Sequence, residues 1–133
     1  MENQLEDTVL PSELISRFIA QRKWYRTKDK TVKHNAFMPN KNRVVSLYRT
    51  TGLGEAQIYE IGQRYVADMW KKSLLGRAEI VVSNILKHGL KVQADPNPHP
   101  RHANIVDWPE DELKHRMIAI QVAADAQLHL INV

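Results

Sequence analysis

The chain has 133 residues, of which 43% are hydrophobic and 26% are charged, proportions typical of a globular domain. Its length suits one domain with a single hydrophobic core. No apolar run approaches the roughly 20 residues that a membrane-spanning helix requires. The absence of cysteine excludes disulfide bonds, thiolate zinc sites and cysteine nucleophiles. The polar, acidic residues 1–7 are not typical of a secretory signal or a transit peptide, so we expect a cytoplasmic location.

The net charge of +4 is unevenly distributed. Residues 17–49, here called the basic segment, hold ten basic side chains against the single acid Asp29, so the segment carries +9 and the other residues carry −5. Such asymmetry indicates a polyanionic partner, with nucleic acid first and an acidic protein surface second. A solvated basic surface without a partner is the alternative. The ten residues are Arg17, Arg22, Lys23, Arg26, Lys28, Lys30, Lys33, Lys41, Arg43 and Arg49.

The first residues, 1–11, lack periodicity and are expected to form a partly ordered lead-in to a single domain over 12–133. From Ser12 onward, Leu14, Ile15, Phe18 and Ile19 have the spacing of one helical face. The sequence therefore predicts a short helix at this point.

Two aromatic residues, Trp24 and Tyr25, lie among cations between Gln21 and Lys30. Nucleic-acid surfaces combine cations for phosphates with flat rings on which unpaired bases stack. The pattern predicts that Trp24 or Tyr25 stacks on a base. The alternative is that both rings close an edge of the core.

Residues 32–38 and 43–49 each have the alternation of a strand, and Pro39 to Asn42 supply turn residues between them. They predict an antiparallel hairpin with Lys41 and Arg43 near its tip. A helix is predicted over 55–72, because Ile58, Ile61, Tyr65, Val66 and Met69 recur on one face.

A shorter helix is predicted over 73–88, ending at Gly89, and a strand over 90–94. A proline-rich stretch, 96–109, follows. In it, Ile105 and Trp108 are expected to enter the core, and Asp107 has capping-box spacing to Glu110. The last helix is predicted to run to about Leu130 and to be the central one, with an apolar face formed by Leu113, Met117, Ile120, Ala124 and Leu128.

The proline-rich stretch also holds the weak candidates for catalysis. His99, Arg101 and His102, with Arg49 from the hairpin, could cleave a phosphodiester, because histidine moves protons near neutral pH and arginine holds phosphate oxygen atoms. A surface loop without chemistry is the alternative. No metal site, cofactor site or Ser/His/Asp arrangement is indicated by the spacing of the residues.

Three stretches carry a resemblance. Pro100 to Pro109 reads Pro-Arg-His-Ala-Asn-Ile-Val-Asp-Trp-Pro, and Leu47 to Leu53 and Leu75 to Glu79 accompany it. Together they resemble a group of short uncharacterised bacterial proteins, over about residues 16–128. The resemblance implies a bacterial, cytoplasmic protein and carries over no functional residue.

We therefore expect an α+β domain in which a basic hairpin and one further strand pack against helices. The first hypothesis for function is a nucleic-acid-binding protein without catalytic activity. The second is an interaction subunit that binds an acidic protein, and the third is a small nuclease or phosphotransfer enzyme. The residues expected to contact nucleic acid are Arg22, Lys23, Trp24, Tyr25, Arg26, Lys28, Lys30, Lys33, Lys41 and Arg43.

Overall fold

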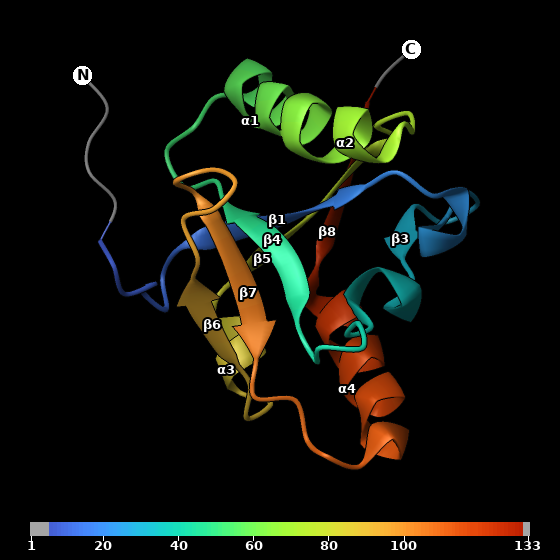
Figure 1. Ribbon diagram of the computed structural model, residues 1–133. Coiled ribbons are helices and arrows are strands. Elements are labelled where there is room, and N and C mark those ends of the chain that lie inside the picture. Colours follow the sequence, from blue (N-terminus) through green and yellow to red (C-terminus); the bar gives the residue numbers. More distant parts are fainter. Residues whose placement is uncertain (1–5, 132–133) are drawn as a thin grey trace.

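The computed structural model describes residues 6–131 and shows a single compact α+β domain, which confirms the predicted fold class (Figure 1). Its strands are β1 Leu14–Ile19, β2 Tyr25–Arg26, β3 Thr31–Val32, β4 Val45–Arg49, β5 Gly76–Val81, β6 Lys91–Ala94, β7 His102–Val106 and β8 Gln127–Leu130. Its helices are α1 Glu55–Gly62, α2 Asp68–Trp70, α3 Ser83–Leu86 and α4 Glu112–Asp125. Shorter helical turns are η1 Arg22–Trp24 and η2 His34–Phe37, and η3 Gln63–Ala67 is a π-helical segment.

Six strands form one sheet in the order β6-β7-β4-β1-β5-β8, and every neighbouring pair is antiparallel. The strands β2 and β3 form a separate two-stranded ribbon. This ribbon, with η1 and η2, lies in the connection between β1 and β4. The basic segment therefore emerges from the middle of the sheet rather than from its edge.

Each face of the sheet is covered by helices (Figure 1). Ile15, Val45 and Ile105 belong to the larger core, which also contains residues of η2, α3 and α4. Phe18 and Tyr48 point to the other face and pack against α1. Because successive side chains of a strand alternate between faces, one set of strands supplies both cores.

Because both faces of the sheet are covered, the helix predicted near residues 14–19 is wrong. Residues 14–19 form β1 and not a helix, and Ile15, Phe18 and Ile19 are all buried. A strand that is buried on both faces need not alternate between apolar and polar residues. Its apolar positions can then imitate a helical spacing, as they do here.

The predicted hairpin between 32–38 and 43–49 is also wrong. The strand β3 ends at Val32 and pairs with β2, whereas the following residues form η2. The strand β4 occurs where it was predicted, but it pairs with β1 and β7. Phe37 of η2 is fully buried in the larger core, and burying this ring outweighs continuation of the strand.

The predicted helix over 73–88 is wrong, because the region contains β5 followed by the short α3. Arg77 and Glu79 lie on one face of β5, and Ala78 and Ile80 lie on the other. The two polar residues are paired there, since Arg77 forms ion pairs with Glu55 and Glu79. Burial of paired charges in a strand is a tertiary outcome that a hydrophobic pattern does not signal.

The helix predicted over 55–72 is confirmed as a continuous helical segment from Glu55 to Trp70, and the strand predicted over 90–94 is confirmed as β6. One detail of the helix is wrong: Met69 was assigned to its buried face but is 61% exposed. The proline-rich stretch is not a loop throughout, because its residues 102–106 form β7. Ile105 and Trp108 are buried, as predicted.

The last helix differs from its prediction in three ways. It begins after Asp111, whose side chain accepts a hydrogen bond from the backbone N–H of Leu113, so Asp107 is not the cap. It ends at Asp125, and the following residues form β8. The predicted apolar face is largely exposed, with Leu113 87% and Met117 64% accessible. His115, Ala119, Val122 and Ala123 are buried instead, and α4 packs against η2, β3 and α3.

The helix is therefore not the centre of the fold, which is the sheet. Residues 1–11 were predicted to form a partly ordered lead-in. Residues 1–5 of this segment lie outside the described part of the chain. Of the rest, Val9 is 8% exposed and belongs to the larger core.

Candidate functional site

The cations of the basic segment fall into two groups. Arg17 and Arg49 are bonded within the protein. The other eight form no ion pair with any described residue, and all are exposed except Lys33, which is half-buried. They extend over η1, the β2–β3 ribbon and the turn before β4. These eight are Arg22, Lys23, Arg26, Lys28, Lys30, Lys33, Lys41 and Arg43.

The two aromatic residues of the basic segment have different surroundings. Tyr25 is 7% exposed and belongs to the larger core, so its ring offers little surface on which a base could stack. Trp24 is half-buried, and the guanidinium of Arg17 lies over its ring at 4.7 Å from the centroid. Only Trp24 can contribute the stacking that was predicted for this pair.

Trp24 lines a cavity of about 450 Å³ between the splayed ends of β1 and β4 and the helical segment α1–α2. We call it the aromatic cavity, because its walls include Phe18, Trp24, Tyr48, Tyr65 and Trp70. Its volume lies within the range of about 300–1,000 Å³ that is usual for small-molecule sites. Its charged lining residues are Arg17 and Lys72, and no described acid lines it.

The sequence interpretation did not identify Trp70, which is 70% exposed at the end of α2. An exposed tryptophan followed by Lys71 and Lys72 repeats the combination of ring and cation that drew attention to Trp24. That signal was available in the sequence. That Trp70 lines the same cavity as Trp24 was not, because it depends on how the helical segment packs in the folded domain.

Tyr65 reaches the aromatic cavity from the π-helical segment η3. Its ring also meets the imidazole of His99 edge-on, with 4.9 Å between the centroids. Short π-helical segments within an α-helix shift the side chains that follow and occur frequently at functional sites. Here the segment brings one tyrosine between the cavity and the proline-rich stretch.

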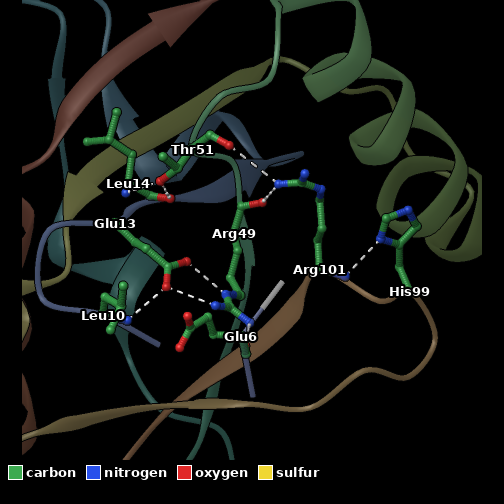
Figure 2. Close-up of polar contacts among 8 residues, drawn as sticks. All are labelled: Glu6, Leu10, Glu13, Leu14, Arg49, Thr51, His99 and Arg101. Carbon is green, nitrogen blue, oxygen red and sulfur yellow. Dashed lines mark hydrogen bonds and ion pairs between the residues drawn. The ribbon is translucent and has the colours of Figure 1, made fainter. Parts of the chain in front are cut away.

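Arg49 and Arg101 have structural roles (Figure 2). Arg49 donates from Nε and Nη2 to the two carboxylate oxygen atoms of Glu13, both at 2.8 Å, and from Nη1 to the carbonyl of Glu6. Arg101 donates from Nη1 to the carbonyl of Arg49 at 3.1 Å. Each nitrogen of the Arg49 guanidinium already donates a hydrogen bond to a protein oxygen atom. Arg49 therefore stabilises the fold and has no nitrogen left without a protein partner.

This buried pair predicts a pH dependence of stability. Burial by itself raises the pKa of Glu13, but the hydrogen bonds from Arg49 and from the backbone of Leu10 outweigh it, so the pKa lies below its ordinary value of 4.5. A carboxyl group with a lowered pKa stabilises the fold above the pKa of the unfolded chain, and this stabilisation is lost as the pH falls.

We expect the urea midpoint of the protein to decline as the pH is lowered below about 4.5, and Glu13→Gln to flatten this decline. The measurement is a series of urea unfolding curves from pH 6 to pH 3. The exposed Glu60, which pairs with Arg64, provides the matched control, and Glu60→Gln should keep the decline of the wild type. Equal declines in the wild type and in Glu13→Gln would contradict the role given to the pair.

The two histidines of the proline-rich stretch, His99 and His102, have different contacts. His99 accepts a hydrogen bond from the backbone N–H of Arg101 and contacts Tyr65. His102 lies in β7, with its side chain 9% exposed and its ring edge-on to Tyr48 at 5.2 Å. The structure therefore does not join Arg49, Arg101 and His102 through their side chains.

Instead, His102 contacts Ser46, a residue that the sequence interpretation did not consider. The Oγ atom of Ser46 lies 2.6 Å from Nε2 of His102. Nδ1 of His102 lies 2.9 Å from the backbone carbonyl of Asp95 and 3.6 Å from its Oδ2. A carbonyl oxygen only accepts, so in the neutral imidazole Nδ1 carries the proton and Nε2 accepts from the hydroxyl of Ser46.

The β4–β7 pairing creates this contact. Tyr48 lies opposite His102 and Ser46 lies opposite Asn104, so Ser46 and His102 are diagonal neighbours on one face. The two residues are 56 positions apart in the chain. No local spacing relates the two residues, which is why the sequence itself indicated no Ser/His/Asp arrangement.

The remaining observations concern what is not found. Within residues 6–131, no group of three or more histidine, cysteine, aspartate or glutamate side chains could hold a metal ion. None of the helices described is both long enough and apolar enough to cross a membrane. Comparison with protein-family models, curated proteins and solved structures finds no match to this chain. The resemblance to short bacterial proteins stays a prediction.

Proposed function

We propose that the protein binds single-stranded nucleic acid through the basic segment and the aromatic cavity. The observation that carries this proposal is that cations without an ion pair among residues 6–131 lie near the accessible rings of Trp24 and Trp70. Gln21, Trp24 and Asn40 line the cavity and are adjacent in sequence to Arg22, Lys23 and Lys41. Backbone phosphates would meet these cations while bases enter between the rings.

The charge of the cavity supports an anionic ligand. Arg17 and Lys72 are its charged lining residues, and the acids of the chain are concentrated outside the basic segment. Each lysine or arginine that meets a phosphate releases condensed counterions, which is the main source of affinity for nucleic acid. The exposed cations of the basic segment would contribute this part of the affinity through counterion release.

The aromatic rings favour the binding of single-stranded nucleic acid over the binding of a duplex. Bases that are stacked and paired in a duplex cannot present their faces to a protein, whereas unpaired bases can stack on aromatic side chains. Trp70 is 70% exposed and Trp24 is half-buried, so both rings are accessible to a ligand to different extents. Stacking on such rings contributes about 1–3 kcal/mol per base.

A titration at rising salt tests the proposal. Binding of a 20-nucleotide oligothymidylate, followed by tryptophan fluorescence, should weaken with salt with a slope of log K against log salt of roughly −3 to −6, because about four to eight cations each contribute about −0.7. A duplex of the same length should bind more weakly, and oligouridylate tests whether RNA is accepted. A flat dependence on salt would contradict the proposal.

Poly-glutamate separates nucleic-acid binding from the recognition of an acidic protein. It carries negative charge on a flexible chain but has no rings to stack. We expect it to bind more weakly than oligothymidylate at equal salt and to leave the tryptophan fluorescence of the protein unchanged. Binding of both polymers with equal affinity would favour an interaction subunit for an acidic protein.

A further inference from the structure

The contact between Ser46 and His102 has the geometry that activates a serine. The hydroxyl of Ser46 donates to Nε2 of His102 at 2.6 Å, and Nδ1 donates to the carbonyl of Asp95 at 2.9 Å. The ring of Tyr48 holds the imidazole from a third side. The orientation and tautomer of His102 are therefore set before any ligand arrives, which is the arrangement that a general base beside a nucleophile requires.

Ser46 also has access to a cavity. Ser46 and Tyr48 are alternate residues of β4 and therefore point to one face, and both line the aromatic cavity together with Val44, which precedes the strand. Ser46 is half-buried. By contrast, Ser16 on the neighbouring strand is fully buried, and its hydroxyl contacts that of Thr50 at 2.9 Å. Only the former has both a histidine partner and a space in which a substrate could lie.

We propose that Ser46 is a nucleophile, with His102 as its general base, that hydrolyses carboxylic esters carrying an aromatic group. In the first step, Ser46 Oγ forms a bond to the carbonyl carbon and its proton passes to Nε2 of His102. The tetrahedral intermediate then breaks its bond to the alcohol oxygen, which takes the proton from His102. A water molecule repeats both steps on the acyl-serine and releases the carboxylic acid, so ester and water give acid and alcohol without redox change.

The lining of the cavity determines the substrate class. The rings of Phe18, Tyr48 and Tyr65 favour an aromatic or flat apolar group by burial and edge-to-face contact. The cations Arg17 and Lys72 disfavour a positively charged substrate. The substrate is therefore a neutral or anionic ester.

Arg17 is the residue placed to stabilise developing negative charge. Its Nη1 donates to the carbonyl of Ser46 at 2.8 Å and its Nε to the carbonyl of Ala36 at 2.9 Å. Nη2 has no hydrogen-bond partner among residues 6–131. The guanidinium thus lies beside the nucleophilic residue with donors to spare, as the oxyanion of an acyl transfer requires.

Asp95 is a positioning residue, because it acts on the reaction only through His102. Its carbonyl holds Nδ1, and its carboxylate accepts a hydrogen bond from Asn104 at 3.2 Å. The proposal goes beyond nucleic-acid binding and does not rest on it, since none of the eight cations expected to contact nucleic acid takes part in the ester chemistry.

Covalent labelling with an alkyl fluorophosphonate tests the proposal. This probe forms a phosphorus–oxygen bond with an activated serine and loses fluoride. We expect labelling at Ser46, identified by mass spectrometry of peptides, and hydrolysis of 4-nitrophenyl butyrate by the same protein. Ser46→Ala and His102→Gln should each slow both reactions on the order of 100-fold or more. Ser16→Ala, the matched serine variant, should keep the wild-type rates.

Two measurements separate chemistry from folding. Circular dichroism melts show whether each variant is folded, and Ser46→Cys keeps a nucleophile at the same position. Iodoacetamide should alkylate Cys in Ser46→Cys faster than in the double variant Ser46→Cys with His102→Gln, because only the former retains the base. Equal alkylation rates, or labelling of wild type no faster than that of Ser46→Ala, would overturn the proposal. Neither result would affect the salt titration, so the two functions fail separately.

Discussion

Replacing Arg49 with alanine should reduce the free energy of unfolding by about 3–5 kcal/mol, the usual cost of breaking a buried ion pair. The side chains of Arg49 and Glu13 are only 3% and 10% exposed, and two hydrogen bonds of 2.8 Å join them. Removal of the arginine leaves a buried carboxylate without its cation. Domains of this size are stable by roughly 5–15 kcal/mol, so the loss is a large part of the total.

Urea unfolding curves of the two proteins at pH 7 measure this difference. Arg64→Ala is the matched control, because Arg64 pairs with Glu60 at 3.5 Å while both side chains are 66% exposed. Exposed pairs contribute about 0–1 kcal/mol, so this variant should unfold close to the wild type. Similar losses for the two arginine variants would contradict the importance of the buried pair.

A double variant separates the lost ion pair from lost packing. Glu13→Leu combined with Arg49→Met removes both charges and leaves apolar side chains of similar size. Buried pairs can often be replaced by apolar residues at little cost, whereas one unpaired charge cannot. We therefore expect the double variant to be more stable than Arg49→Ala. If it is equally unstable, the volume of the side chains rather than their charge holds this part of the fold.

Removal of four cations beside the aromatic cavity should weaken binding of oligothymidylate on the order of 100- to 1,000-fold at 0.1 M salt. The variant changes Arg22, Lys23, Lys41 and Arg43 to glutamine, and all four side chains are exposed. Four lost phosphate contacts at about 0.7 each should reduce the slope of log K against log salt by about 3. The measurement is the salt titration by tryptophan fluorescence.

The matched control removes the same charge from another part of the surface. Lys87, Lys91, Lys114 and Arg116 are exposed, lie outside the basic segment and do not line the aromatic cavity. Their replacement by glutamine gives the same net charge, but at 0.1 M salt charges act over only about 10 Å. This control should bind nearly as well as the wild type. An equal loss in both variants would indicate a general effect of net charge instead of a local site.

The sequence pattern correctly predicted those elements that bury side chains on one face and expose them on the other. The helical segment from Glu55 to Trp70 covers one face of the sheet, so its amphipathic spacing was readable, and β6 is an edge strand with simple alternation. The strands β1 and β5 lie inside the sheet and are covered on both faces. Their patterns imitate helices, and their identity follows only from the pairing between them.

The C-terminal helix shows a second kind of limit. Its sequence has two possible apolar faces, one with large side chains from Leu113 to Ile120 and one with Ala119, Val122 and Ala123. Hydrophobicity favours the first, but the structure buries the second. The choice depends on the space between α4 and the segments η2, β3 and α3 that it packs against, which is a property of the assembled core.

For function, the sequence by itself determined the charge asymmetry, the absence of cysteine chemistry and the combination of rings with cations around Trp24. These depend on composition and on neighbours in the chain. The tertiary structure decided that Tyr25 belongs to the core, that Trp70 and Tyr65 join Trp24 around one cavity, and that Arg49 is occupied by Glu13. It also decided that Ser46 meets His102, because a strand register joins residues that no local pattern relates.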